Sequence, residues 1–179
     1  MADILEFDQV LKLLAAAKAE SEEDWLLFAV TFIHALRASE AVALTADNIK
    51  GTRLSAKRRK GSKPVDDELL VSKNPLLNER DSLIALCRRT PGKQRLFPIS
   101  TRTFQRRVHY YGANAGLPEE WCHPHTLKHS ILDHLRLSGM DLAELQDRSG
   151  HVSLDSLRVY LHPKKVVTDR MVHERLQAF

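Results

Sequence analysis

The chain has 179 residues, of which 43% are hydrophobic, enough for one domain with a substantial core. No apolar run is long enough to span a membrane, and the N-terminus lacks the basic and apolar regions of a secretory signal. Two cysteines, Cys87 and Cys122, are too few for a disulfide framework or a cysteine-based zinc site, so the expected location is the reducing cytoplasm.

The first part of the chain is predicted to be helical. Residues 7–19 repeat apolar side chains at helical spacing. After a cap at Ser21, the stretch WLLFAVTFIHAL is apolar on nearly all sides, which is typical of a buried central helix. Arg37 follows this helix directly, so we expect rigid structure to hold its guanidinium and the Glu40 carboxylate to orient it. A plain surface salt bridge between the two is the alternative.

A small sheet and two further helices are predicted next. From Asp47, turn signals separated by alternating segments predict a small antiparallel sheet, with residues 57–63 at the tip of a hairpin. The dipeptide Asn74-Pro75 predicts a helix that starts there and runs to residue 89. A cap at Ser100 or Thr101 predicts another helix. The succession of helices, a small sheet and more helices indicates an α+β fold that is mostly α.

The stretch from His125 to Tyr160 concentrates side chains that can do phosphoryl chemistry. His125 and His129 stand four residues apart on one helical face, with Lys128 beside them. The glycines and capping residues of this stretch predict three short helices, the second of them opened by an Asp-x-x-Glu capping pair. These helices are expected from near His125 to Gly139, from Asp141 to Gly150, and from Ser153 through Tyr160. A last amphipathic helix is expected from Pro163 and could dock in cis or on a neighbouring molecule.

Positive charge gathers in two places. Six of the eleven residues from Arg53 to Lys63 are Lys or Arg, and the helix after Ser100 carries a second cluster. The net charge is +4. Two basic patches favour a phosphate-rich partner, although solvated surfaces without a specific role are the alternative. The residues taken as DNA-binding candidates are Arg58, Arg59, Lys63, Arg102, Arg106 and Arg107.

Five short motifs occur in an order that resembles one known family. They are A-L-R-A-S-E (35–40), R-K-G-S-K (59–63), H-T-L-K-H (125–129), S-G-H (149–151) and Tyr160. In this order and spacing they resemble the catalytic domain of tyrosine recombinases, the phage integrase family, over almost the whole chain. The resemblance implies that residues 1–179 form one catalytic domain. The separate N-terminal DNA-binding domain that family members usually carry is not expected in this sequence, which fits either a minimal recombinase or a fragment of a longer protein.

The resemblance also implies a mechanism of DNA strand cleavage and rejoining. Tyr160 would attack a phosphodiester to give a 3′-phosphotyrosine and a free 5′-hydroxyl. Arg37 would hold the non-bridging oxygens, and Lys60 would protonate the leaving 5′-oxygen. His125 would act as acid or base near the tyrosine, and His151 would donate a hydrogen bond to the phosphate. Such chemistry needs positioning and charge neutralisation, which Arg, Lys and His can supply.

Several points of this assignment stay open. Lys57 and Lys63 are alternatives to Lys60 as the acting lysine. Lys128 stands where the family has a second arginine, and a lysine keeps the charge but loses the planar two-pronged grip on phosphate oxygens. Lys128 therefore fits a working variant, a slow enzyme that depends on a partner, or a degenerate DNA-binding relic. Ser149 replaces the family's usual leucine, a milder departure.

The resemblance implies double-stranded DNA as partner, with tetrameric self-association on DNA, no cofactor and no membrane. Three other functions are alternatives. A metal site could use His123, His125 and His129, but the glutamate of the H-E-x-x-H pattern is missing and Lys128 would place a cation beside the metal. The others are a non-catalytic DNA-binding module and a type IB topoisomerase, which shares much of the chemistry.

Overall fold

The centre of the fold is a pair of packed helices. The computed structural model describes residues 4–58 and 62–150. Within them, α1 (Phe7–Glu20) and α2 (Glu22–Ile33) pack against each other, and the Ser21 side chain between them accepts a hydrogen bond from the Asp24 N–H. Ten of the twelve α2 residues are buried, as its apolar sequence predicts. The predicted central helix is therefore confirmed.

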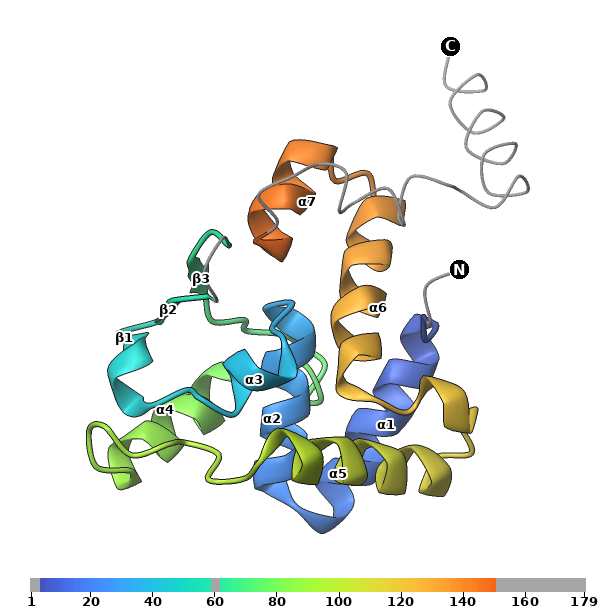
Figure 1. Ribbon diagram of the computed structural model, residues 1–179, viewed down its shortest axis with the longest axis horizontal. Coiled ribbons are helices and arrows are strands. Elements are labelled where there is room, and N and C mark those ends of the chain that lie inside the picture. Colours follow the sequence, from blue (N-terminus) through green and yellow to red (C-terminus); the bar gives the residue numbers. More distant parts are fainter. Residues whose placement is uncertain (1–3, 59–61, 151–179) are drawn as a thin grey trace.

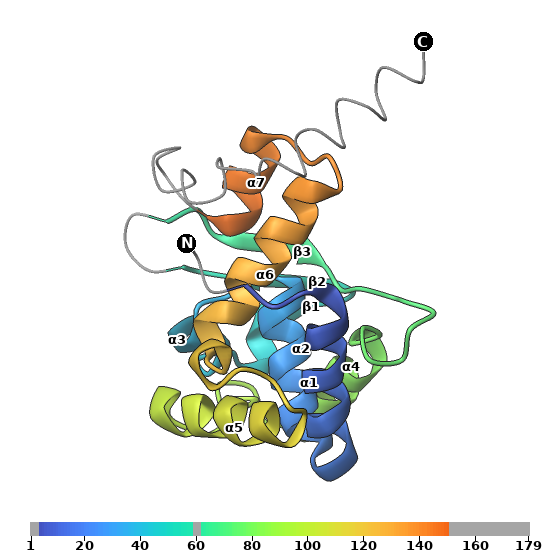
Figure 2. The same ribbon diagram turned by 90° about the vertical axis from the view of Figure 1, so that its right-hand side faces the viewer.

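Two longer helices cover this pair. Figure 1 shows α5 (Thr101–Asn114) running across one end of α1 and α2, with α6 (Pro124–Leu137) standing beside them. Ser100 caps α5, as predicted, and the Phe104 ring stacks on Phe28 of α2 with 5.5 Å between centroids. Figure 2 shows α1, α2 and α6 grouped on the same side of the molecule. A short 3-10 turn (Glu119–Trp121) precedes α6.

The sheet is small and antiparallel, as predicted. Its strands, in the order β1-β2-β3, are β1 (Ile49–Lys50), β2 (Arg53–Ala56) and β3 (Val65–Glu68). The register pairs Leu54 with Asp67 and Ala56 with Val65. The short α3 (Ala38–Ala41) and a 3-10 turn (Ala46–Asn48) connect α2 to the sheet. The hairpin connection between β2 and β3 carries the predicted basic residues.

The helix predicted from Asn74 starts later than expected. The structure has α4 at Arg80–Arg89, and residues 74–77 form a turn in which the Asn74 side chain accepts a hydrogen bond from the Leu76 N–H. The Leu76 carbonyl accepts from the indole N–H of Trp25, and the Glu79 carboxylate accepts from the Leu70 N–H. In a helix that started at Asn74, the Leu76 carbonyl would bond the Arg80 N–H, but here it bonds Trp25, and the Arg80 N–H donates to the Leu70 carbonyl at 3.4 Å.

The chain then turns back towards the sheet through α7 (Leu142–Ser149). The predicted capping pair of Asp141 and Glu144 opens this helix, and Gly150 ends it in the left-handed conformation at φ +70°. Figure 1 shows α7 beyond the far end of α6, on the side facing β3. The helices predicted from Ser153 and from Pro163 lie outside the described residues. Within the described ranges, no helix has the length and apolar character needed to cross a membrane.

Candidate active site

Arg37 is held in place by the segment that joins α2 to α3. Ala35 adopts a left-handed conformation at φ +49°, so the chain turns between the end of α2 and the start of α3, where Arg37 lies. The Glu40 carboxylate accepts two hydrogen bonds of 2.8 Å from Arg37, one from its backbone N–H and one from Nη1. The Glu40 side chain is 6% exposed, whereas that of Arg37 is 28% exposed. The pair is therefore an oriented, half-buried unit and not a plain surface salt bridge.

The Glu40 carboxylate stays ionised at this position. Burial alone would raise the pKa of Glu40, but the hydrogen bonds from the Arg37 backbone and guanidinium lower it below its usual range. Nη1 of Arg37 also donates to the Ser62 hydroxyl at 3.2 Å, across to the hairpin loop. Arg37 thus keeps an exposed face while its orientation is fixed from two sides.

Lys128 lies in the interior beneath Arg37. Its side chain projects from α6 and the residue is 1% exposed, with Nζ donating to the carbonyls of Ala35 and Ser149 at 2.9 Å each. Burial, together with the nearby positive charges of Arg58 and Arg37, lowers the pKa of Lys128 to about 7. Lys128 therefore joins the α2–α3 turn to the C-terminal end of α7.

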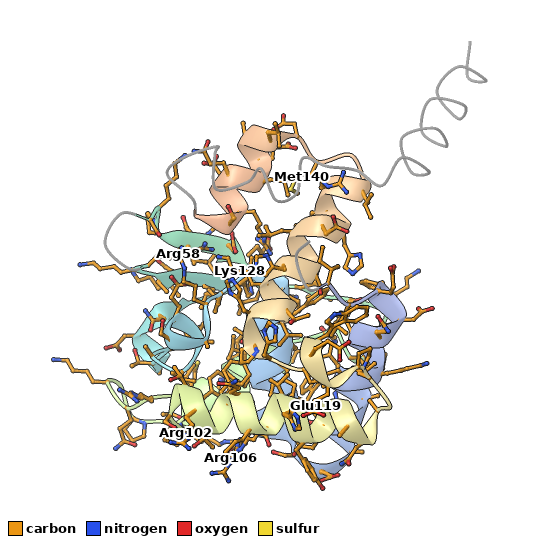
Figure 3. The ribbon with its side chains drawn as sticks, turned by 45° about the vertical axis from the view of Figure 1, so that its right-hand side comes forward. Arg58, Arg102, Arg106, Glu119, Lys128 and Met140 are labelled. Carbon is orange, nitrogen blue, oxygen red and sulfur yellow. The ribbon has the colours of Figure 1, made fainter. Side chains whose placement is uncertain are left out.

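Arg58 also lies in the interior, which corrects the prediction that it is an exposed DNA contact. Its guanidinium donates to the carbonyls of Ser149, Arg148 and His34. The residue is 9% exposed, and burial lowers its pKa. The last carbonyls of a helix lack partners within the helix, so a planar donor at the ends of α7 and α2 satisfies several of them at once. Figure 3 shows Arg58 and Lys128 close together between the sheet and α6.

His125 and His129 lie on the side of α6 near this cluster. His125 is exposed, and its ring meets that of His129 edge-on with 4.1 Å between centroids. Burial first, and then the charge of Lys128, lower the pKa of His125, so its imidazole is available as a neutral base. An open cleft of about 360 Å³ runs from Ala38, next to Arg37, to His125 and Arg102. The predicted pairing of His125 with Arg37 in one site is consistent with this placement.

Of the predicted basic residues of the hairpin, Arg58 is buried and Lys63 lies at the surface. Lys63 is half exposed, forms an ion pair with Asp147 of α7, and its N–H donates to the Gly150 carbonyl at 3.2 Å. Four of the predicted site residues lie outside the described residues. These are Arg59, Lys60, His151 and Tyr160.

The second basic cluster lies on the outer face of α5. Arg102 and Arg106 are exposed there, as Figure 3 shows, beside an open hollow of about 710 Å³ that Gln105 and Tyr110 also line. Arg107 differs, because its guanidinium pairs with Asp24, a carboxylate that is 7% exposed. Arg107, whose side chain is 40% exposed, therefore links α5 to α2 through Asp24, and Arg102 and Arg106 are the more exposed arginines of this face.

Sequence reasoning missed a buried ionic network next to the site. The His34 ring lies 3.0 Å from Asp67 and 2.6 Å from Glu79, and Arg148 of α7 lies 2.8 Å from the same Asp67 oxygen. Burial lowers the pKa of His34, but the charges and hydrogen bonds of Glu79 and Asp67 together raise it by more, so the net shift of the pKa is upward. The signal in the sequence was a histidine at the end of an otherwise apolar helix.

The described part of the site has an excess of positive charge. The three cations Arg37, Arg58 and Lys128 lie close to the buried carboxylate of Glu40, and Asp67 also acts on Arg58. Among the described residues, no group of three or more His, Cys, Asp or Glu side chains is arranged to hold a metal ion. A half-buried cationic site next to a neutral imidazole can bind a phosphate group and assist proton transfer at it.

Comparisons with known proteins agree with this geometry. The model of the phage integrase family matches residues 3–166. A tyrosine recombinase of Pseudothermotoga lettingae is 28% identical over 89% of this chain and 56% of its own length, and XerC of Mycobacterium tuberculosis is 32% identical over 96% and 62%. The chain thus spans less than two thirds of these relatives.

Solved structures share the fold. The XerA recombinase superposes with a TM-score of 0.74 at 19% identity, over 98% of this chain and 64% of that chain. The catalytic domain of bacteriophage HP1 integrase superposes with a TM-score of 0.66 at 20% identity, over 89% and 86%. The fold, the order of the motifs and the family match over most of its length lead to one conclusion: this chain belongs to the phage integrase family of tyrosine recombinases.

Proposed function

We propose that this chain is the catalytic domain of a site-specific DNA recombinase that cleaves and rejoins strands through a 3′-phosphotyrosine. The observation that carries the proposal is the cluster of Arg37, Arg58 and Lys128 around the buried carboxylate of Glu40. Buried charges in proteins are normally compensated, so a preorganised excess of cations favours an anionic ligand. A DNA phosphate beside the exposed face of Arg37 supplies that anion.

The proposed reaction uses residues of this chain for each transfer. The Tyr160 oxygen attacks phosphorus and loses its proton with the help of His125, and the bond to the 5′-oxygen breaks. Lys60 gives a proton to that oxygen, while Arg37 and His151 bind the non-bridging oxygens. The covalent phosphotyrosine conserves the energy of the phosphodiester, and attack by a 5′-hydroxyl of another strand reseals it. The phosphoryl group passes between oxygens, so no oxidation or reduction is involved.

We further propose that the outer face of α5 binds double-stranded DNA. Arg102 and Arg106 are exposed there, and the cleft at Arg102 leads to His125. Two similar structures are recombinases bound to DNA: XerH on its difH substrate and a lambda integrase dimer on a core site. By analogy, this chain assembles with further copies on DNA, and it acts in the compartment that contains that DNA, the cytoplasm. Phosphate contacts by arginine predict binding that weakens steeply with salt.

A second candidate is a DNA-binding module that does not cleave. One observation favours it: Lys128 donates to two backbone carbonyls and is almost fully buried, so two of its three protons are already engaged. In the first candidate Lys128 contributes charge and positioning, whereas in the second the site has lost its grip on phosphate. The two candidates differ in one observable, a covalent protein–DNA adduct.

The test is a trapping experiment with nicked duplexes. The probes are duplexes made from the DNA that flanks the gene, nicked so that the cleaved strand is lost and religation is prevented. We expect an adduct that survives SDS and disappears in Tyr160→Phe. DNA binding without an adduct would favour the second candidate. Relaxation of plasmids without defined sites would instead indicate a type IB topoisomerase.

A further inference from the structure

We propose that Arg58 is a positioning residue that fixes the hairpin loop carrying Lys60 onto the C-terminal end of α7. It does so together with Lys128, which holds the same Ser149 carbonyl. The inference rests on the proposed strand-cleavage function and assigns to an arginine outside the recognised motifs a role in that reaction. Three features of the structure carry it.

The first feature is the number of carbonyls that Arg58 bonds. Its Nη1 donates to Ser149, and its Nη2 donates to Arg148 at 2.8 Å and to His34 at 3.3 Å. These carbonyls belong to the ends of α7 and α2, which lie about 90 and 24 residues from Arg58 in the sequence. One guanidinium therefore joins three separate segments: the hairpin, the end of α2 that leads to Arg37, and the end of α7 that leads to His151.

The second feature is that both ends of the loop are attached to the same place. Arg58 stands at the start of the loop and Lys63 at its end. The Lys63 N–H donates to the Gly150 carbonyl at 3.2 Å, and its ammonium pairs with Asp147. Between them, the Ser62 hydroxyl accepts a hydrogen bond from Arg37. In the sequence, Lys60 stands two residues from one attachment and three from the other, which is why we infer a positioning role for these contacts.

The third feature is the close fit at Gly150. This residue is in the left-handed conformation at φ +70°, and a Cβ added there would stand 2.6 Å from Cδ and 2.9 Å from Cζ of Arg58. Only glycine satisfies both conditions, because a side chain would displace the guanidinium as well as strain the backbone. The S-G-H motif thus contributes a glycine that admits Arg58.

Arg58 and Lys128 both hold the C-terminal end of α7 by donating to its carbonyls. A lysine ammonium has no planar fork, and Nζ of Lys128 bonds the Ala35 and Ser149 carbonyls. The guanidinium of Arg58 donates to the same Ser149 carbonyl and also to the carbonyls of Arg148 and His34. Because position 128 is 1% exposed, a second guanidinium there would compete with Arg58 for the same carbonyls. The effects of substitutions at the two positions are therefore coupled.

The experiment compares Arg58→Ala with Arg53→Ala, a control arginine of the same hairpin that pairs with Asp66 at the surface. Single-turnover cleavage and salt-dependent DNA binding are measured for both. We expect Arg58→Ala to slow cleavage about 10²-fold, the cost of a misplaced catalytic group, while Arg53→Ala stays near wild type. Because Arg58 does not touch DNA in this account, the slope of log K against log salt stays unchanged. A direct phosphate contact would reduce that slope by about 1.

A second substrate distinguishes misplacement of Lys60 from general damage. In a duplex whose bridging 5′-oxygen is replaced by sulfur, the leaving thiolate needs no proton donor, since a thiol has a pKa of about 8.5. We expect Arg58→Ala to regain most of its rate on this substrate, and Arg58→Lys to be intermediate on the ordinary one. If Arg58→Ala does not fold, Arg58→Lys provides the same comparison.

Three outcomes overturn the inference: equal rates for Arg58→Ala and Arg53→Ala, a reduced salt slope, or no recovery on the sulfur substrate. In a double substitution, Lys128→Arg should restore part of the cleavage lost in Arg58→Ala, whereas independent effects would contradict the coupling. If the wild-type chain forms no adduct on any substrate, the proposed function fails, and that result is distinct from these.

Discussion

Two buried ionic clusters meet at the end of α2, and their charge balance differs. On one side, His34 and Arg148 face the carboxylates of Asp67 and Glu79, so two cations match two anions when His34 is protonated. On the other side, among the described residues, Arg37, Arg58 and Lys128 act on the carboxylate of Glu40, and Asp67 of the first cluster also acts on Arg58. A hydrogen bond from Arg58 to the His34 carbonyl connects the two.

The pKa shifts express the same difference. The matched network raises the pKa of His34 and lowers that of Asp67, so both groups are stabilised in their charged forms. Burial first, and then the positive charges of Arg58 and Arg37, lower the pKa of Lys128 to about 7, so its charged form is disfavoured. A balanced network is complete without a ligand and acts in stability, whereas an unbalanced one becomes complete when an anion binds. This contrast separates a structural cluster from a functional one.

The largest expected effect is on catalysis, at Arg37. We expect Arg37→Ala to reduce the rate of DNA cleavage by about 10²–10³-fold, because one preorganised donor to the phosphate is lost. The matched control is Arg136→Ala, an arginine that pairs with Asp133 on the same helix, α6. Single-turnover cleavage measures the difference, and similar rates for the two variants would remove Arg37 from the site.

The next effect is on stability, at His34. In His34→Leu, the carboxylates of Asp67 and Glu79 lose their shared partner inside the protein. Breaking a buried ionic group in this way typically costs about 3–5 kcal/mol of the free energy of unfolding. Urea unfolding measures it. A loss no larger than that of His109→Leu, whose partner Glu119 is exposed, would show that the network is not balanced as described.

The pH dependence of stability should have opposite signs in the two clusters. The raised pKa of His34 gives stability that is complete below pH 6.5 and is lost as the pH rises through its higher folded value. Lys128 is the reverse: between about pH 7 and 10.5 the unfolded chain binds the extra proton, so its contribution becomes more favourable as the pH rises.

Urea unfolding of wild type, His34→Leu and Lys128→Met from pH 6 to 10 separates the two contributions. Lys128→Met should remove the rise of the free energy of unfolding with pH, and His34→Leu should remove its fall. Identical curves for wild type and Lys128→Met would mean that Lys128 is as easily charged in the folded protein as in water.

The smallest effect is expected at the DNA surface. Arg106→Ala should weaken binding about equally for all sequences and reduce the salt slope by about 1, since one phosphate contact is lost. Arg107→Ala should leave the slope unchanged, because that guanidinium pairs with Asp24. A larger change in slope for Arg107→Ala would assign the DNA contact to the other side of α5.

Local chemistry made much of the fold predictable. Ser21, Ser100 and the Asp141–Glu144 pair are helix caps whose partners lie three residues away, so sequence spacing is sufficient to find them. The pairing of Arg37 with Glu40 was predictable for the same reason. The start of α4 was not, because the indole of Trp25, about 50 residues earlier, bonds the Leu76 carbonyl.

The candidate site was predictable only where a motif marked it. Arg58 was assigned to the DNA surface because its neighbours in the sequence are basic, yet its partners at Arg148 and Ser149 lie about 90 residues away. The balancing carboxylates of His34 come from β3 and from the residue before α4, and no local pattern connects them. Whether a buried charge is matched depends on such distant contacts, which spacing along the chain does not encode.

The most direct test of the contrast between the clusters is the pKa of the Lys128 ammonium, followed by NMR in selectively labelled protein with and without duplex DNA. In the free protein we expect a value near 7, which rises when a phosphate occupies the site and completes its charge balance. A value near 10.5 in the free protein, or one that does not move when DNA binds, would contradict the account.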